Sequence, residues 1–344
     1  MNRAAEILLT PGSALYSALA RARVAAYRRG LLSAQNVVAP VVSVGNLTTG
    51  GTGKTPLVAW TARVLAAEGR RVCVLTRGYG RANPSERVLV SDGAQIFVDA
   101  RKGGDEPCWL AENLLGAAAV LADRDRVAAA RWALAELQSD CFVLDDGFQH
   151  IRLARACDLV TIDATNPWGG GYLLPRGRLR EPLTALRRAT ACVITRADQA
   201  NNLAELLAQV TEISGGRPVF AARTKVSGAR PLWPEYGAVL SVDTPVLAFC
   251  ALGNPAAFFR QATAAGYTLA AQQAFRDHHY YQAQDMAALA QKARAVGAQA
   301  LLTTAKDAVK LQQIGSGLPI FVLDIELEIE REGELRELLR GVLA

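Results

Sequence analysis

A lysine and a threonine stand at the end of a glycine-rich loop near the start of the chain. The apolar residues 41–44 lead towards the sequence Gly50-Gly51-Thr52-Gly53-Lys54-Thr55, and a helical pattern follows over residues 55–68. Glycines allow successive backbone N–H groups to converge on phosphate oxygens, the lysine reaches the β- and γ-phosphates, and the threonine hydroxyl holds Mg²⁺. The strict pattern has a glycine where Thr48 stands. This order of strand, loop and helix predicts a nucleotide-binding P-loop.

Two carboxylates follow another apolar run. Asp145 and Asp146 come directly after residues 141–144. The carboxyl ends of parallel strands lie at one edge of a sheet, so these acids would lie beside the P-loop if the two strands are neighbours. A pair of aspartates can also simply begin a turn. Beside a P-loop, we favour a role for the pair near the metal ion.

The segment Arg77-Gly78-Tyr79-Gly80-Arg81 follows the apolar run 72–76. If that run is a strand of the same sheet, the segment lies at the same functional edge. Its glycines and arginines suit an anionic ligand, although a solvated turn has a similar composition.

Asp105 and Glu106 open the helix that we expect over residues 105–115. Acidic residues are favoured at the N-terminus of a helix, so capping is one interpretation of Asp105. The other is that its carboxylate accepts a hydroxyl proton while the hydroxyl oxygen attacks a γ-phosphate.

The chain has three histidines, of which His278 and His279 are adjacent and follow Asp277. An aspartate–histidine pair can tune a catalytic base, but the cluster could equally be a set of metal ligands or a capped turn. No other histidine or cysteine has the spacing of a zinc site, so we expect no structural zinc.

Short apolar runs alternate with helical patterns along most of the chain. We expect buried strands at residues 41–44, 72–76, 118–121, 141–144, 159–162 and 192–195, and helices at 55–68, 105–115, 124–138 and 199–213. After the polar, proline-containing passage 227–245, further strands are expected at 246–250, 269–275, 300–303 and 320–323, and helices at 255–265 and 283–295. The alternation predicts an α/β fold: a P-loop NTPase-like, mostly parallel sheet with helices on both faces, plus a second, smaller α/β domain.

The expected organisation has five segments: an N-terminal amphipathic helix (1–31), a P-loop domain (32–218), a linker strand (219–234), the smaller domain (235–321), and a returning linker strand with a C-terminal helix (322–344). Residues 323–329 alternate strictly between apolar and acidic residues, which predicts a strand exposed on one face. We expect this strand to pair with residues 219–233 as a two-stranded ribbon between the domains, and helix 331–342 to pack on the first domain.

The N-terminal segment predicts a helix that begins near Ser13. Tyr16, Ala20, Val24, Tyr27 and Leu31 recur at spacings of four and three, which gathers them on one face. Arginines flank that face, so the helix can lie on an anionic bilayer, or it can pack on its own domain. A signal peptide is disfavoured because polar residues interrupt the first apolar stretch.

The composition excludes several classes of protein. The 344 residues are 51% hydrophobic and 20% charged, which excludes intrinsic disorder, and no apolar run approaches the ~18 residues of a membrane span. The net charge of +6 fits an anionic partner. Six cysteines occur without a C-x-x-C pair, so we expect buried thiols in a reducing cytosol.

Several motifs occur together in one order along the chain: Gly50-Gly51-Thr52-Gly53-Lys54-Thr55-Pro56, Arg77-Gly78-Tyr79-Gly80-Arg81, Gly104-Asp105-Glu106-Pro107, Asp145-Asp146-Gly147-Phe148-Gln149-His150, Leu179-Arg180-Glu181-Pro182 and Asp277-His278-His279. This series closely resembles the tetraacyldisaccharide 4′-kinases, the lipid A kinases of Gram-negative bacteria, from about residue 41 to residue 310. The set is far more specific than any single motif. That family's loop likewise lacks the first glycine, so Thr48 does not weaken the resemblance.

The resemblance implies that the chain transfers the γ-phosphate of ATP, with Mg²⁺, to the 4′-hydroxyl of a tetraacyldisaccharide 1-phosphate, a lipid A disaccharide precursor. It also implies a peripheral position at the cytoplasmic face of the bacterial inner membrane, with residues 1–31 on the anionic membrane surface. We expect no nucleic acid partner, and we expect a monomer.

By the same resemblance, Asp105 is the catalytic base, His278 assists it and Lys54 acts on the phosphate; the sequence does not separate His278 from His279. The expected ATP contacts are Thr49, Gly50, Gly51, Thr52, Gly53, Lys54, Thr55 and Arg126, with Arg124 as the alternative to Arg126. The expected metal ligands are Thr55, Asp145, Asp146 and Glu106, and the expected substrate contacts are Asn46, Arg77, Tyr79, Gln149, Arg180 and Glu181. Lys306-Asp307 also resembles a family motif, to which we assign no role beyond helix capping or domain contact.

Two other classes of P-loop protein share part of the pattern. Partition-type and metallochaperone ATPases also contain Gly-Gly-x-Gly-Lys-Thr, but they usually carry a signature lysine where Thr49 stands. A GTP-binding switch needs an Asn-Lys-x-Asp motif that recognises the guanine base. The sequence Thr195-Arg196-Ala197-Asp198 is only distantly similar to that motif.

Overall fold

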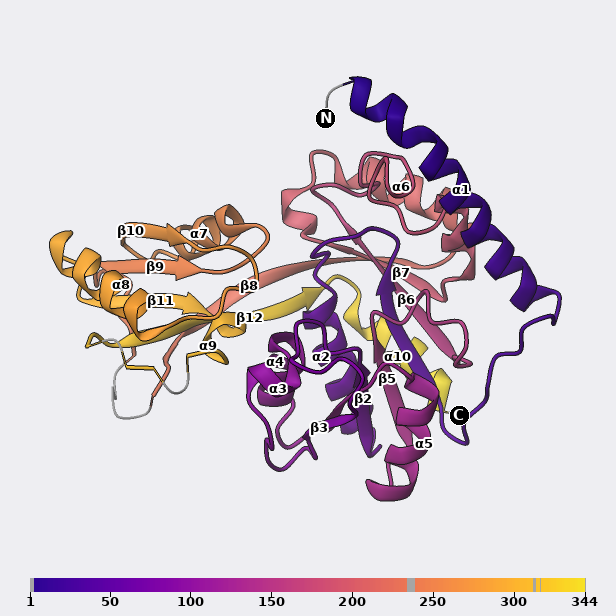
Figure 1. Cartoon of the computed structure of the whole chain (residues 1–344), viewed down its shortest axis with the longest axis horizontal. Helices are drawn as coiled ribbons and strands as arrows, with labels where there is room; N and C mark the ends of the chain where they lie inside the picture. Colours follow the sequence, from indigo (N-terminus) through magenta and orange to yellow (C-terminus); the bar gives the residue numbers. More distant parts are fainter. Residues whose placement is uncertain (1–2, 234–238, 312–313, 316, 344) are drawn as a thin grey trace.

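The computed structural model describes residues 3–233, 239–311, 314–315 and 317–343. Within these residues twelve strands form one sheet in the order β10-β9-β11-β12-β8-β7-β6-β1-β5-β2-β4-β3 (Figure 1). The strands are β1 (Val41–Asn46), β2 (Val72–Thr76), β3 (Val88–Ser91), β4 (Ala118–Ala122), β5 (Cys141–Asp145), β6 (Cys157–Asp163), β7 (Ala191–Thr195), β8 (Val219–Pro231), β9 (Val246–Cys250), β10 (Leu269–Ala274), β11 (Ala300–Thr304) and β12 (Ile320–Ile329). The helices are α1 (Arg3–Arg28), α2 (Lys54–Ala67), α3 (Ala100–Gly103), α4 (Asp105–Asn113), α5 (Arg126–Glu136), α6 (Leu203–Ser214), α7 (Pro255–Ala264), α8 (Ala283–Ala295), α9 (Ala305–Ala308) and α10 (Glu332–Leu343), with the 3₁₀ helices η1 (Leu183–Arg188) and η2 (Ala197–Gln199).

The P-loop part of the sheet is parallel from β8 to β4 and is covered on both faces. Because side chains alternate along each strand, Val42 and Val44 pack with α2, α4 and α10, whereas Val41 packs with α5 on the other face. The neighbouring strands β6 and β7 pack against η1 and α6. Strands β1, β2, β4, β5 and β7 are buried along their whole length, as the apolar runs predict.

The second part repeats this layering on a smaller scale. Strands β9, β11 and β12 are parallel and pack against α7 on one face and α8 on the other. The expected α/β class, with a mostly parallel sheet and a smaller second α/β unit, is therefore confirmed.

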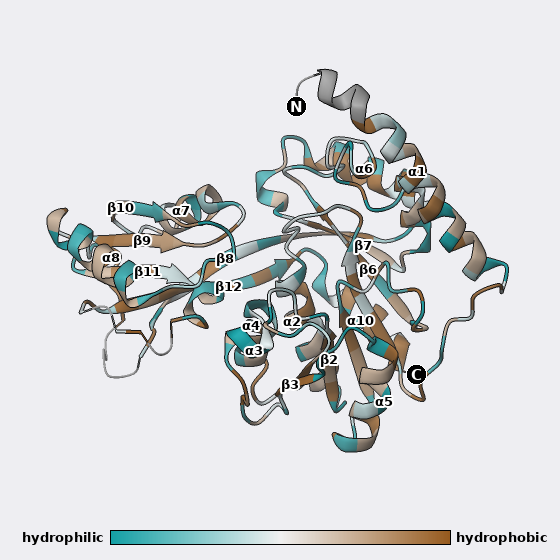
Figure 2. Cartoon of the chain, viewed as in Figure 1, coloured by the Kyte–Doolittle hydropathy of each residue, from teal (hydrophilic) through white to brown (hydrophobic). Residues whose placement is uncertain are grey.

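Strands β8 and β12 connect the two parts as an antiparallel pair, with Phe321 opposite Pro231 and Ile329 opposite Ala222. Hydrophilic residues occupy the middle of this pair, whereas β9, which β11 separates from it in the sheet, is hydrophobic (Figure 2). After Ile329 the chain returns to the first part, where Leu335 and Leu339 of α10 join its core. The predicted pairing and the predicted packing of the C-terminal helix are confirmed. The boundary expected at residues 234–235 lies outside the described residues.

The N-terminal helix departs from the sequence prediction at both ends. Helix α1 begins at Arg3 instead of Ser13, with Pro11 inside it. A proline removes only one backbone donor, so a long helix can continue through it at an energetic cost. The helix ends at Arg28, where Gly30 turns the chain with φ of 73°, and Leu31 is 75% exposed beyond it. The predicted face is therefore shorter by one residue.

Three further expectations have clear outcomes in the described residues. Strand β3 was not predicted, because it is a four-residue edge strand that pairs antiparallel with β4. All six cysteines are free and buried, as expected. Over the part of the chain that the structure covers, no helix is long and apolar enough to cross a membrane.

Candidate active site

The P-loop joins β1 to α2 at the carboxyl edge of the sheet. Gly53 precedes the helix with a left-handed backbone (φ 71°), and a Cβ at this position would lie 3.2 Å from the side chain of Thr195. Glycine is required by both the conformation and the space. Lys54 and Thr55 therefore begin α2, where the backbone N–H groups of a first helical turn can receive phosphate.

Hydrogen bonds within the protein hold the loop. Asn46 donates from Nδ2 to the carbonyl oxygen of Thr48 at 2.7 Å and to Oγ1 of Thr52 at 2.9 Å. Arg196, which follows β7, donates to the carbonyl oxygen of Gly51 at 3.0 Å. Asn46 is fully buried, so the structure places it inside the loop and not at an exposed substrate-facing position.

The acidic pair lies beside this loop, as predicted, because β1 and β5 are neighbours and Val44 is opposite Asp145. Lys54 Nζ lies 3.6 Å from Asp146 Oδ1, and Arg180 donates to Asp146 Oδ2 at 2.7 Å. Burial alone would raise the pKa of Asp146, but Lys54 and Arg180 together hold that pKa below its usual value. Asp146 therefore remains ionised between two cations.

Asp145 has a different environment. Thr76 donates to its Oδ2 at 2.9 Å. Burial, followed by the negative charges of Glu106 and Asp146, raises the pKa of Asp145 to about 6.

Oδ1 of Asp146 is buried and accepts no hydrogen bond from a described residue. Carboxylate and hydroxyl oxygens are the ligands that Mg²⁺ prefers, and the expected ligands Thr55, Asp145, Asp146 and Glu106 carry such oxygens. In the described residues, however, no three or more His, Cys, Asp or Glu side chains form a group that could hold a metal ion.

Of the other expected arginines, Arg126 interacts with the charges of the acidic pair, and Arg77 interacts with the charge of Arg126. Arg126 is 5% exposed and close enough to Asp145 and Asp146 to interact with their charges, whereas Arg124 is exposed. The structure thus places Arg126, and not Arg124, at the site. Arg77 donates to the hydroxyl of Tyr79 at 2.8 Å and lies 5.0 Å from its ring centroid, and the tyrosine is 50% exposed.

Asp105 is brought into contact with a histidine from the second part of the chain. His278 Nδ1 lies 2.7 Å from Asp105 Oδ2, although the two residues are 173 positions apart. His279 instead contacts Asp285 at 2.9 Å and stacks on Phe275. The geometry therefore selects His278 over His279 as the partner of Asp105.

Asp105 is not the N-cap of α4. Gly104 occupies that position with φ of 95°, and a Cβ there would lie 2.9 Å from the carbonyl oxygen of Tyr79. Asp105 is 3% exposed, and its Oδ1 accepts a hydrogen bond from the backbone N–H of Glu106 at 2.9 Å. The hydrogen bond from the first turn of α4 therefore uses one carboxylate oxygen and leaves the other to the histidine.

The contact between Asp105 and His278 shifts the pKa values of both residues. Burial works against the ionised carboxylate, yet the hydrogen bond from His278 and the charge of Lys306 lower the pKa of Asp105. The hydrogen bond to Asp105 is the main cause that raises the pKa of His278. Asp105 is therefore held as an acceptor.

Two residues of the second part reach this region without having been predicted as site residues. Lys306 Nζ lies 3.3 Å from Glu106 Oε1 and 3.7 Å from Asp105 Oδ2. Tyr280 donates to the carbonyl oxygens of Gly80 and Ala100 at 3.2 and 3.3 Å. The resemblance of Lys306-Asp307 to a family motif was the available signal for the lysine, whereas nothing in the sequence distinguishes Tyr280 from the tyrosine beside it.

Gln149 and Glu181 form part of the wall behind the loop. Gln149 donates from Nε2 to the carbonyl oxygen of Asn46 at 2.9 Å and to Glu181 Oε1 at 3.2 Å. Glu181 is 5% exposed and is paired with Arg188 through both carboxylate oxygens, at 2.7 and 3.1 Å. These two residues support Arg180, whose Nη1 also donates to Gln149 Oε1 at 3.2 Å.

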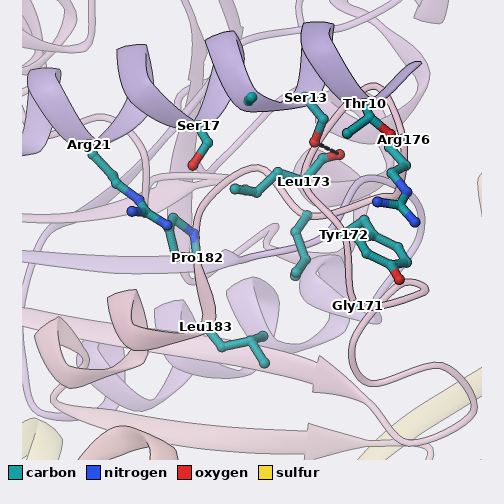
Figure 3. A pocket seen from close by; sticks show the side chains of 12 residues that line it. Thr10, Ser13, Ser17, Arg21, Gly171, Tyr172, Leu173, Arg176, Pro182 and Leu183 are labelled. Carbon is teal, nitrogen blue, oxygen red and sulfur yellow. Dashed lines mark hydrogen bonds between the residues drawn. The ribbon is translucent and has the colours of Figure 1, made fainter. Parts of the chain in front are cut away.

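A pocket of about 360 Å³ lies between α1 and the segment that leads to Arg180 (Figure 3). Its wall includes Arg21 from the helix and Arg176 from the segment, and Ser13 donates to the carbonyl oxygen of Leu173 across it at 2.9 Å. A second pocket of about 310 Å³ continues along α1 and is lined by further arginines, including Arg28. Basic side chains thus border the space between α1 and the P-loop part.

A P-loop at the carboxyl edge of a parallel sheet, with an acidic pair beside its lysine and a carboxylate–histidine pair nearby, defines a P-loop phosphotransferase. The family model described as Tetraacyldisaccharide-1-P 4′-kinase (LpxK) matches residues 5–344, and the chain belongs to this family. The expected resemblance is therefore confirmed and extends beyond residues 41–310. The chain is an ATP-dependent lipid kinase of lipid A biosynthesis.

Individual relatives agree with this assignment. The chain is 42% identical to the tetraacyldisaccharide 4′-kinase of Anaeromyxobacter dehalogenans strain 2CP-C, over 94% of this chain and 86% of the relative. It is 40% identical to the enzyme of the same name from Geobacter metallireducens, over 93% of each. The crystal structure of LpxK from Aquifex aeolicus in complex with ATP superposes with a TM-score of 0.80 at 30% identity, over 98% of this chain and 99% of that one.

Proposed function

We propose that this enzyme transfers the γ-phosphate of ATP to the 4′-hydroxyl of a tetraacyldisaccharide 1-phosphate, with Asp105 as the proton acceptor. The contact of 2.7 Å between His278 and Asp105 carries the proposal. The next residue, Glu106, acts electrostatically on Asp145, which links this pair to the acids beside Lys54. One site can therefore hold both the phosphate and the attacking hydroxyl.

The cations of the P-loop part would neutralise the triphosphate. Phosphoryl transfer spreads negative charge over the γ-phosphate oxygens, so cations fixed beside them lower the barrier. Lys54 and Arg126 have this role in the proposal, together with the backbone N–H groups of residues 49–55. Arg196 and Asn46 contribute by holding the loop that presents those groups.

The chemistry of the expected ligands supports Mg²⁺ as the cofactor. Thr55, Asp145, Asp146 and Glu106 would hold the ion, and the buried Oδ1 of Asp146 has a free acceptor position. When bound, Mg²⁺ supplies charge neutralisation across the β- and γ-phosphates.

Asp105 would take the proton of the acceptor hydroxyl as the new O–P bond forms. The bond between the γ-phosphorus and the bridging oxygen breaks in the same reaction, and ADP leaves with that electron pair. A sugar hydroxyl is barely acidic, so a carboxylate fixed by His278 is useful even though its own pKa is low.

The lipid acceptor would approach between α1 and the P-loop part. Arg77, Tyr79 and Arg180 would contact the headgroup, and the arginines around the two pockets suit its phosphate. One face of α1 is half-buried and carries Tyr16, Ala20, Val24 and Tyr27. Membrane contact would therefore fall to the opposite face, where Leu15 and Leu19 are 63% and 62% exposed. We place the enzyme on this basis at the cytoplasmic face of the inner membrane, as a peripheral monomer.

The two parts of the chain would act as separate domains, divided as the sequence predicts into residues 32–218 and 235–321. Each part has hydrophobic clusters of its own, and the strands β8 and β12 join them. Twisting of this pair would change the distance between His278 and Asp105.

The test is direct transfer of phosphate. The purified enzyme is incubated with γ-labelled ATP, Mg²⁺ and a purified tetraacyldisaccharide 1-phosphate in mixed micelles, and the label in the lipid is measured. Label at the 4′-position supports the proposal. ATP hydrolysis without lipid labelling would contradict it and would favour an ATPase of the partition or metallochaperone type.

A further inference from the structure

Lys306 is placed where its ammonium group can act on two acidic side chains of the other part of the chain. It lies in the short helix α9, which follows β11, and its Nζ is 3.3 Å from Glu106 Oε1 and 3.7 Å from Asp105 Oδ2. The lysine side chain is 20% exposed and that of Asp105 is 4% exposed. The contact is therefore shielded from solvent and is stronger than an ordinary surface ion pair.

The residue next to Lys306 anchors α9 from behind. Asp307 accepts hydrogen bonds through Oδ2 from Thr304 Oγ1 at 2.7 Å and from the backbone N–H of Ala251 at 3.1 Å. Its Oδ1 lies 2.9 Å from Lys310 Nζ, and both of these side chains are fully buried. A buried charge that is paired in this way cannot move without losing its partners. The position of Lys306 is thus fixed by the core of the second part.

We propose that Lys306 is a positioning residue for phosphoryl transfer, which holds the carboxylates of Asp105 and Glu106 in their working orientations from across the domain boundary. The inference rests on the proposed role of Asp105. Asp105 and Glu106 both lie within 4 Å of Lys306 Nζ, at 3.7 and 3.3 Å, and the charge of Glu106 also acts on Asp145. Carboxylates this close together repel one another. Lys306 offsets that repulsion at the two carboxylates that His278 and the metal ion require.

Removal of the ammonium group leaves two neighbouring carboxylates without compensation. We expect Lys306→Ala to lower kcat roughly 10- to 100-fold, the usual effect of removing one charged partner from a site of this kind. The KM for ATP should change less than about threefold, because Lys54 and the loop are untouched. Lys306→Arg, which keeps the charge, should remain within about tenfold of the wild type.

A matched control is Lys292→Ala, since the ammonium group of Lys292 donates to Gln272 and Gln273 within the second part. Its kcat should equal that of the wild type. Loss of thermal stability in Lys306→Ala with an unchanged kcat would overturn the inference and leave Lys306 as a domain contact. A raised KM for ATP with an unchanged kcat would also overturn it, because the lysine would then bind phosphate directly.

A double-mutant cycle tests whether Lys306 acts through Asp105. In the Asp105→Asn background, Lys306→Ala should lower kcat by less than a further factor of about three, since the carboxylate that Lys306 holds is gone. The inference would be contradicted if the fold reductions in kcat of the two single variants multiplied fully in the double variant. If Asp105→Asn is itself fully active, the proposed base is wrong; if Asp105→Asn is inactive while Lys306→Ala is normal, only the role of Lys306 fails.

Discussion

The two halves of the candidate site are built in different ways. The P-loop half takes its residues from the ends of adjacent strands, with Lys54 after β1 and Asp146 after β5. The acceptor half takes Asp105 from α4, His278 from the segment between β10 and α8, and Lys306 from α9. The first half is complete within one part of the chain, and the second exists only where the two parts meet.

This difference separates binding from catalysis. The interactions found for Lys54, Arg180 and Asn46 are with residues of the first part, so we expect the P-loop half to bind nucleotide wherever the second part lies. Asp105 has its partners His278 and Lys306 only when the second part is docked, and Tyr280 stabilises that docking through Gly80 and Ala100. We expect substitutions in the two halves to affect different kinetic constants.

The largest effect is expected in the P-loop half. Lys54→Ala should lower the rate of phosphate transfer at least ~10³-fold, because the lysine acts on charge that develops in the transition state. The melting temperature should change little, since Arg180 still pairs with Asp146. Lys225→Ala, on the exposed middle of β8, is the control. Activity of Lys54→Ala within tenfold of the wild type would remove the P-loop half from the mechanism.

A smaller effect is expected for the histidine of the acceptor half. His278→Ala should lower kcat about 10- to 100-fold, because Asp105 loses the imidazole partner of its Oδ2 but remains a carboxylate. His279→Ala serves as the control, since His279 contacts Asp285 and not Asp105. Steady-state kinetics on both variants decide the assignment. Equal losses in the two variants would mean that the segment, and not one imidazole, matters.

The smallest effect concerns delivery of the lipid to the site. Leu15→Asn with Leu19→Asn should lower vesicle binding roughly tenfold, because two exposed leucines would no longer enter the bilayer interface. The fold should be unaffected, since neither residue is buried. Val296→Asn, an exposed apolar residue of the second part, is the control in the same co-sedimentation assay. Unchanged binding would mean that α1 only packs on its own domain.

The sequence predicts the P-loop half well because its residues are close together in the chain and have distinctive spacing. A glycine-rich loop and an acidic pair after apolar runs indicate neighbouring strand ends, and β1 and β5 are neighbours. The strict alternation after Leu323 likewise predicts the pairing of β12 with β8.

The acceptor half is less predictable because its contacts are long-range. Nothing local distinguishes His278 from His279, and only the docking of the second part selects between them. From spacing and composition, Lys306 resembles any lysine on the surface of a helix, and only its neighbours across the domain boundary distinguish it. The short edge strand β3 and the passage of α1 through Pro11 escape local rules for the same reason, since packing outweighs propensity.

Asp105→Asn separates nucleotide binding in the P-loop half from acceptor activation in the other half. The affinity for ATP is measured by titration with a fluorescent ATP analogue, and the chemical step by single-turnover transfer to the tetraacyldisaccharide 1-phosphate. We expect the Kd for the analogue to change less than about twofold while the transfer rate falls about 10²-fold or more, since only proton acceptance is lost. A parallel loss of nucleotide affinity and transfer rate, or an unchanged transfer rate, would contradict this separation.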